Sequence, residues 1–306
     1  MTTPDWFVFS FGAGLLSLVV FLRFYHRRRY GTVRPEPVVI LTYHKVQNRP
    51  ELGGTWLTVG AFRRQMEVVR GLPVLHLTDY LDALGRGCDA GRGVVLTFDD
   101  GYESVYTGAW PVLRELKLPA TVFLVTGYMG RANDWDQPLA RGAFRHLSWS
   151  QAREMAADGL VRFASHGVTH RDLTALDDAE LERELCESRA AITEGLGRAP
   201  EAFSYPFGRF DARVVAALRE AGYTYGVAVT SRPGWSRRNP LAVARTGMYV
   251  TDGVNALKVR LGLRSPGRYW AEDLNNRIIN RFTLLTASLQ RCDLRGRRYG
   301  CGSKKP

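Results

Sequence analysis

An alternation of short apolar runs with helix-like segments is the feature that most limits the fold of this 306-residue chain. Strands that alternate with helices predict a parallel sheet, either open or closed into a barrel. In both arrangements, functional side chains gather at the carboxyl ends of the strands. The predicted strands lie within residues 38–44, 94–98, 121–125, 161–166, 202–208 and 223–230, and the predicted helices within 61–72, 149–160, 176–197 and 211–222.

Polar side chains follow several of these predicted strands. Asp99 and Asp100 stand side by side directly after the run VVLTF, while His44 and His166 end two other strands. A buried carboxylate is costly unless it is paired or bound to a metal. A solvated Asp-Gly turn is the alternative interpretation of the aspartate pair. The position of these groups predicts one shared site at the strand ends.

The stretch ASHGVTH places His166 and His170 four residues apart. This spacing can bring two imidazoles to one metal ion, although two ordinary loop histidines are an alternative. Two histidines and one carboxylate form a common hydrolytic zinc set and equally a non-haem iron set. One of the two adjacent aspartates could be the third ligand, and the other could be the base that takes a proton from the attacking water.

Three motifs together resemble a known family. TFDDG (97–101), SHGVTH (165–170) and SYPFG (204–208) occur in the order found in polysaccharide deacetylases with a NodB homology domain, carbohydrate esterase family 4. The resemblance covers roughly residues 36–250. It implies an α/β fold, a distorted (β/α) barrel, and metal-dependent removal of N-acetyl groups from an amino sugar in a polysaccharide or lipid-linked glycan.

The resemblance also implies a role for each matching residue. Asp99 would be the catalytic base, and a divalent metal would be held by Asp100, His166 and His170. Zinc is the default metal, and the ligand set also admits iron, nickel or cobalt. The segment that lines the substrate and the oxyanion would be Tyr205, Pro206 and Phe207, with the backbone N–H of Phe207 holding the oxyanion.

Two positions depart from the family pattern. Ser204 stands where the third motif usually has an arginine that positions the base, so Arg209 or Arg245 is a candidate substitute. The chain has no histidine after His170 to act as the usual general acid. However, LTYHKV (41–46) resembles the early motif of the poly-N-acetylglucosamine deacetylase branch, which implies that His44 is the acid. A structural core histidine is the alternative for His44.

Two other functions compete with hydrolysis of an amide. A barrel without catalysis could bind carbohydrate or act as a scaffold at the membrane, and the missing motif arginine keeps this alternative open. A glycosidase would need two carboxyl groups about 5–9 Å apart across a sugar. The adjacency of Asp99 and Asp100 does not supply that gap, and the histidines would have no role.

The net charge of +12 is concentrated at the two ends of the chain. Residues 1–35 carry +4 and residues 258–306 carry +9, which leaves −1 for residues 36–257. A nucleic-acid-binding fold would normally carry its basic surface within the folded domain. The distribution predicts a neutral deacetylase barrel at 36–257 between two basic segments that contact an anionic membrane, with no nucleic-acid partner.

The N-terminal segment predicts a single-pass membrane anchor. Residues 6–22 carry no charge, and an arginine-rich stretch follows at 23–29. Arginines directly after a first span place the following domain in the cytoplasm. Relatives that modify finished polysaccharide act outside the membrane, so this expectation conflicts with the resemblance. The tail at 258–306 is predicted to be partly helical, with helical apolar spacing at 270–291.

Overall fold

Parallel strands form a closed barrel in the computed structural model, which describes residues 37–51, 53–88, 91–133, 144–229 and 239–264. The ring closes because the first strand pairs with two neighbours, one at each of its edges. In ring order the strands are β1 (Val38–Tyr43), β10 (Val243–Gly247), β9 (Tyr225–Val229), β8 (Ala202–Ser204), β7 (Val161–Ser165), β6 (Ala120–Leu124) and β5 (Gly93–Phe98).

One side of the ring is split. The short strand β4 (Val74–Leu75) pairs with the beginning of β5, and β6 pairs with the end of β5 along the same edge. The barrel is therefore distorted, as the family resemblance implied. A second, two-stranded sheet of β2 (Lys45–Val46) and β3 (Trp56–Leu57) follows β1 directly.

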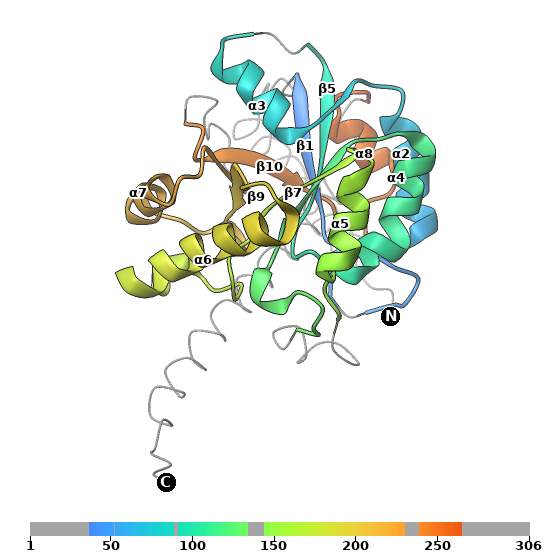
Figure 1. Cartoon of the computed structure of the whole chain (residues 1–306). Coiled ribbons are helices and arrows are strands. Elements are labelled where there is room, and N and C mark those ends of the chain that lie inside the picture. Colours follow the sequence, from blue (N-terminus) through green and yellow to red (C-terminus); the bar gives the residue numbers. More distant parts are fainter. Residues whose placement is uncertain (1–36, 52, 89–90, 134–143, 230–238, 265–306) are drawn as a thin grey trace, which may run out of the picture. The chain divides into compact units, whose positions relative to one another are not determined.

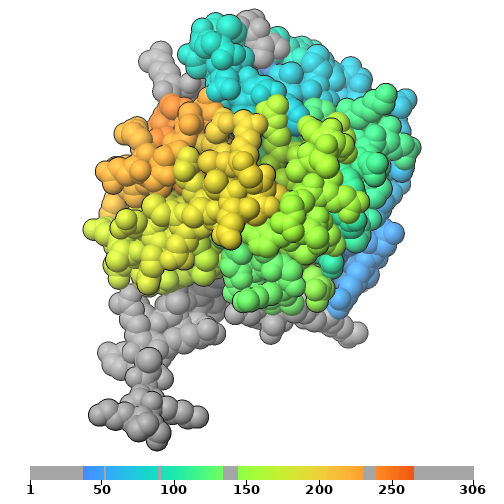
Figure 2. Space-filling model, in the orientation of Figure 1, coloured from blue at the N-terminus to red at the C-terminus, as the bar shows by residue number. Residues whose placement is uncertain are grey.

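Helices lie around the outside of the strands (Figure 1). Figure 2, in the same orientation, shows two of them, α5 and α6, side by side on the surface of the domain. Their starts follow from the sequence, since Ser148 and Asp177 form capping boxes with Gln151 and Glu180. The helices are α2 (Val59–Val69), α3 (Leu77–Gly85), α4 (Trp110–Leu116), α5 (Trp149–Ala157), α6 (Asp178–Leu196), α7 (Ala212–Glu220) and α8 (Val254–Arg260).

The barrel interior changes from apolar to polar along the strands. Near their beginnings, inward side chains form one hydrophobic cluster, against which α3 packs. Because side chains alternate between the two faces of a strand, the next inward residues lie two positions further on. These residues are polar and buried, and the last of them are the predicted site residues. Along β5 the inward series runs Val95, Thr97 and Asp99, and along β7 it runs Ala164 and His166.

The structure confirms the predicted barrel. It also contains four strands that were not predicted from the sequence, of which β4 and β10 belong to the barrel sheet and β2 and β3 form the second sheet. The predicted domain boundary at residue 257 falls inside α8, where Leu257 and Leu261 are buried in the main core. The barrel unit therefore continues past that boundary, because α8 needs both apolar side chains to pack.

The predicted membrane anchor at 6–22 and the predicted helix at 270–291 lie outside the described residues. Within the part of the chain that the structure describes, none of the helices has the length and apolar character needed to cross a bilayer.

Candidate metal centre and catalytic site

Asp99 and Arg245 form a buried bidentate ion pair inside the barrel. The two Nη atoms of Arg245 donate to Oδ1 and Oδ2 of Asp99 over 2.8 and 2.7 Å. Neither side chain is more than 5% exposed. A planar guanidinium that meets both carboxylate oxygens fixes the orientation of the carboxylate as well as its charge.

Two hydroxyl groups complete the surroundings of this pair. Arg245 donates to Oγ of Ser204 at 2.7 Å and to Oγ1 of Thr97 at 3.1 Å, while Ser204 donates to Asp99 at 3.3 Å. The small side chain of Ser204 thus stands beside an arginine that comes from β10. Of the two arginines that the sequence left open, Arg245 contacts Asp99, whereas Arg209 pairs with Asp172 at 3.1 Å.

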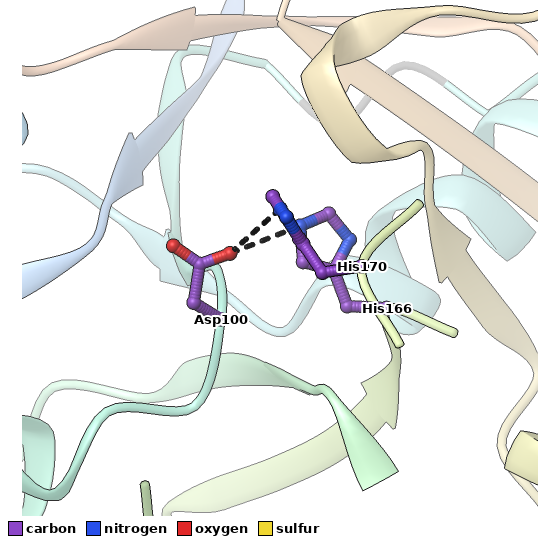
Figure 3. Close-up of side chains that lie close together, drawn as sticks. All are labelled: Asp100, His166 and His170. Atoms are coloured by element: carbon purple, nitrogen blue, oxygen red, sulfur yellow. Dashed lines mark ion pairs between the residues drawn. The ribbon is translucent and has the colours of Figure 1, made fainter. Parts of the chain in front are cut away.

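Asp100, His166 and His170 converge as a buried three-residue cluster (Figure 3). Oδ1 of Asp100 lies 3.3 Å from Nε2 of His166 and 3.2 Å from Nε2 of His170. For metal–ligand bonds of about 2.0–2.1 Å, the edge of a tetrahedron is about 3.3 Å. The two separations from Asp100 therefore fit the ligands of a single zinc-sized cation, and all three ligand atoms lie within 4.8 Å of one another.

A backbone contact fixes the imidazole of His166. Its Nδ1 lies 2.7 Å from the carbonyl oxygen of Ser204, which can only accept a hydrogen bond. Nδ1 therefore carries the proton, and Nε2 is free to face Asp100 and a cation. An outer hydrogen bond of this kind is typical of metal-binding histidines.

Unusual backbone geometry turns Asp100 away from Asp99. Asp100 has φ 67° and Gly101 has φ 63°, both in the left-handed region. A Cβ atom at Gly101 would lie 2.9 Å from a methyl carbon of Leu124, so this position needs glycine. The DDG sequence thus gives its two carboxylates different directions, one toward Arg245 and the other toward the histidines.

His146 supports the same turn and was not predicted as a site residue. Its Nδ1 lies 2.7 Å from the carbonyl oxygen of Asp100, and its buried ring lies 4.9 Å from that of Tyr102. Nothing in the sequence around His146 marks this contact, because the two segments are far apart in the chain.

The charges of the site favour a cation at the cluster. Burial alone favours neutral carboxyl groups, yet the Arg245 guanidinium holds the pKa of Asp99 below its ordinary value. The two histidines hold the pKa of Asp100 well below its ordinary value, again against the effect of burial. Burial also opposes a charged His166, but the neighbouring carboxylates raise the pKa of its imidazole. Both carboxylates are thus kept ionised next to the two histidines.

His44 lies at the same end of the barrel, directly after β1. Burial lowers the pKa of its imidazole, and the charges of Asp100 and Asp99 act in the opposite direction. Its Nδ1 is buried and has no hydrogen-bond partner among the described residues. His44 is thus near both aspartates without being tied to a structural partner through Nδ1.

The segment after β8 contributes to the site through Phe207. The Phe207 ring lies 4.7 Å from that of His170, and its backbone is left-handed with φ 58°. Pro206 is buried beside it. Tyr205, which was predicted to line the substrate, instead directs its side chain into the core, stacks on Phe210 and donates to the carbonyl of Leu241 at 2.7 Å. The alternation of side chains along β8 explains this difference.

The structure is a parallel barrel in which two histidines and one carboxylate, which could hold a metal ion, meet next to an aspartate paired with an arginine. Residues 86–226 match the sequence profile of the polysaccharide deacetylase family. The structure of IcaB from Ammonifex degensii is similar, with a TM-score of 0.61 and 27% identity over 73% of this chain and 96% of that one. The deacetylase PplD from Streptococcus pyogenes shares the fold, with a TM-score of 0.61 and 21% identity over 73% of this chain and 97% of that one.

Sequence relatives agree with this assignment. The poly-beta-1,6-N-acetyl-D-glucosamine N-deacetylase of Staphylococcus aureus is 25% identical over 181 residues, which cover 56% of this chain and 59% of that protein. The Bacillus subtilis protein YxkH is 29% identical over 162 residues, 53% of each chain. The chain thus spans a little over half the length of these curated relatives. Residues 86–226 thus resemble polysaccharide deacetylases, as the motifs indicated.

Proposed function

We propose that this protein hydrolyses the N-acetyl group of an amino sugar within a glycan, with a divalent metal bound at Asp100, His166 and His170. The observation that carries the proposal is the convergence of three ligand atoms next to a carboxylate that Arg245 orients. The curated relative from Staphylococcus aureus is named for poly-beta-1,6-N-acetyl-D-glucosamine, which supports a β-linked N-acetylglucosamine glycan as substrate.

The residues divide the reaction between them. A divalent cation held by the three ligands would polarise the amide carbonyl and lower the pKa of water. Asp99 is the general base that accepts a proton from the attacking water, and its lowered pKa keeps it ionised at neutral pH. The water oxygen bonds to the carbonyl carbon, the developing oxyanion is stabilised by the backbone N–H of Phe207, and the C–N bond then breaks.

The leaving amine needs a proton, and we assign His44 as the group that supplies it. Protonated His44 donates to the sugar nitrogen as the C–N bond breaks, so that acetate and a free amino sugar are released. The lowered pKa of His44 makes its imidazolium a stronger acid than an ordinary histidine. Zinc suits this ligand set best, and iron, nickel and cobalt are the other metals to test.

A catalytically impaired binding barrel was the alternative suggested by Ser204. Its main support was the missing motif arginine, and the two hydrogen bonds from Arg245 to Asp99 weaken that support. The ligand cluster would also be costly to keep in a scaffold, because it buries a carboxylate and two imidazoles in one place.

The test is acetate release from an N-acetylglucosamine oligomer by the purified full chain. We expect hydrolysis that disappears on chelation and returns when Zn²⁺ or Co²⁺ is added back. Undiminished activity of a preparation shown to be metal-free would overturn the proposal. So would the absence of acetate release from β-linked N-acetylglucosamine oligomers by metal-loaded protein.

We further propose that the protein is anchored at the cell membrane with the barrel on the cytoplasmic side. The uncharged run 6–22 and the arginines at 23–29 support this orientation. A lipid-linked or nucleotide-linked amino-sugar precursor would then be the natural substrate, and the N-acetylglucosamine oligomer of the assay would stand in for it. A reporter fused after Pro306 tests the placement: green fluorescence is expected, whereas active alkaline phosphatase there would contradict it and favour mature polymer as substrate.

A further inference from the structure

A buried carboxylate outside the ligand cluster contacts the loop between the two histidines. Glu184 lies on α6 and is 5% exposed. Its Oε2 accepts hydrogen bonds from the backbone N–H groups of Val168 at 2.7 Å and Thr169 at 3.0 Å. Its Oε1 accepts from the hydroxyl of Thr169. One side chain therefore satisfies three donors of the segment that joins His166 to His170.

The opposite side of the loop is held by a different element. The carbonyl oxygens of Gly167 and Val168 accept from the backbone N–H groups of Thr126 and Gly127 at 3.0 and 2.9 Å. Thr126 and Gly127 belong to the short helix η2 (Thr126–Tyr128) that follows β6. The histidine loop thus lies between η2 on its carbonyl side and Glu184 on its amide side.

The loop needs this support because its conformation is strained. His170 has φ 57°, which is unfavourable for a residue with a side chain, and Gly167 has φ 84°. A Cβ atom at Gly167 would lie 2.8 Å from Oε2 of Glu184, so glycine lets the carboxylate approach the backbone. Strained residues at functional sites persist where their surroundings hold them.

We propose that Glu184 is a positioning residue that sets the separation and direction of the two histidine ligands, and so determines metal affinity. The inference rests on the metal site of the proposed function. Its physical basis is that a buried carboxylate costs free energy unless donors satisfy it, and all three donors named above belong to one loop. Groups that orient metal ligands typically change metal affinity by about 10–100-fold when they are removed.

The experiment measures Zn²⁺ affinity of the full chain by competition with a chromophoric chelator, together with the visible spectrum of the Co²⁺ form and the Tm. Glu184→Ala should bind Zn²⁺ about 10–100-fold more weakly and change the Co²⁺ spectrum. Glu184→Gln keeps an amide oxygen for the backbone donors and should recover part of the affinity. Glu187→Gln, an exposed position on the same helix, is the matched control and should match the wild type.

Three further outcomes separate this inference from the proposed function. Wild-type affinity and spectrum in the Glu184 variants, with only a lower Tm, would show a purely structural residue and overturn the inference. If Glu184→Ala does not fold, Glu184→Gln and Thr169→Val test the inference instead, since each removes part of the contact between Glu184 and the loop. Unchanged Zn²⁺ affinity in both variants would overturn the inference. A wild-type protein that binds no metal would overturn the proposed function itself, and the inference with it.

Discussion

Replacing Arg245 by methionine tests how the base is held. Methionine keeps most of the length and apolar volume of the arginine stem but removes the guanidinium. The change deletes both hydrogen bonds to Asp99 and those to Thr97 and Ser204. It leaves the Asp99 carboxylate buried without its cation, which is among the most costly defects in a protein interior.

The expected loss of stability follows from the geometry. Two hydrogen bonds between charged groups contribute about 1.5–3 kcal/mol each. Breaking a buried ion pair by removing one partner costs about 3–5 kcal/mol, in agreement with that range. For a domain of this size, a loss of about 3 kcal/mol lowers the Tm by roughly 6–12 °C.

The pH dependence has a definite sign. In the wild type the pKa of Asp99 is below its ordinary value, so the pair stabilises the fold above the pKa of an unfolded aspartate and loses this contribution as pH falls through the folded pKa. In Arg245→Met, burial favours neutral Asp99 and raises its pKa. The destabilisation should therefore be largest near pH 7 and shrink in acid. The acid limb of the kcat/KM profile should move to higher pH.

The assay is kcat/KM against pH on a chromogenic acetyl ester, combined with thermal unfolding. A residual loss of about 10²-fold is expected even at high pH, because the base is no longer oriented. Arg260→Met is a matched control, since it breaks another buried pair, with Asp252 at 2.8 Å, outside the site. It should lower the Tm without moving the acid limb. An Arg245→Met enzyme with the wild-type pH profile would refute the assignment of Arg245.

Two further predictions separate the roles of the other site residues. Asp100→Ala should abolish both metal binding and activity, whereas Asp99→Asn should abolish activity and keep the metal; a metal-free Asp99→Asn protein would contradict this division. His44→Ala should reduce kcat on amide substrates by about 10²–10⁴-fold and have less effect on activated esters, whose leaving groups need little protonation. An equal loss on both substrates would return His44 to a structural role.

Much of the fold and the site could be predicted from the sequence because the evidence is local. The apolar runs and helix caps depend on neighbouring residues: Asp177 and Asp178 were both candidate caps for the helix at 176–197, and the structure has Asp177 as the N-cap of α6. The DDG turn and the spacing of His166 and His170 likewise lie within single short segments. Their shared position at strand ends predicted one site, and the structure brings Asp100, His166 and His170 together.

Other features depend on contacts between distant parts of the chain. Strand β10, VARTG, carries an arginine and a glycine in five residues, so it lacks the apolar run of a buried strand. Its position is fixed by pairing with β1 and β9, which closes the barrel. That closure is also what brings Arg245 to Asp99, 146 positions away in the chain.

The residues that support the ligands and Asp99 also depend on contacts between distant parts of the chain. Glu184 is one of several acidic residues on an amphipathic helix, and its sequence neighbours do not distinguish it from the exposed Glu187. His146 contacts the backbone carbonyl of Asp100, and the backbone carbonyl of Ser204 contacts His166. Contacts with backbone carbonyls have no sequence signature. The sequence by itself indicated Asp99, Asp100, His166 and His170, because their residue types and spacing are visible within short segments. Only the tertiary structure decided which residues hold them in place, because support of that kind depends on proximity in space and not on residue type.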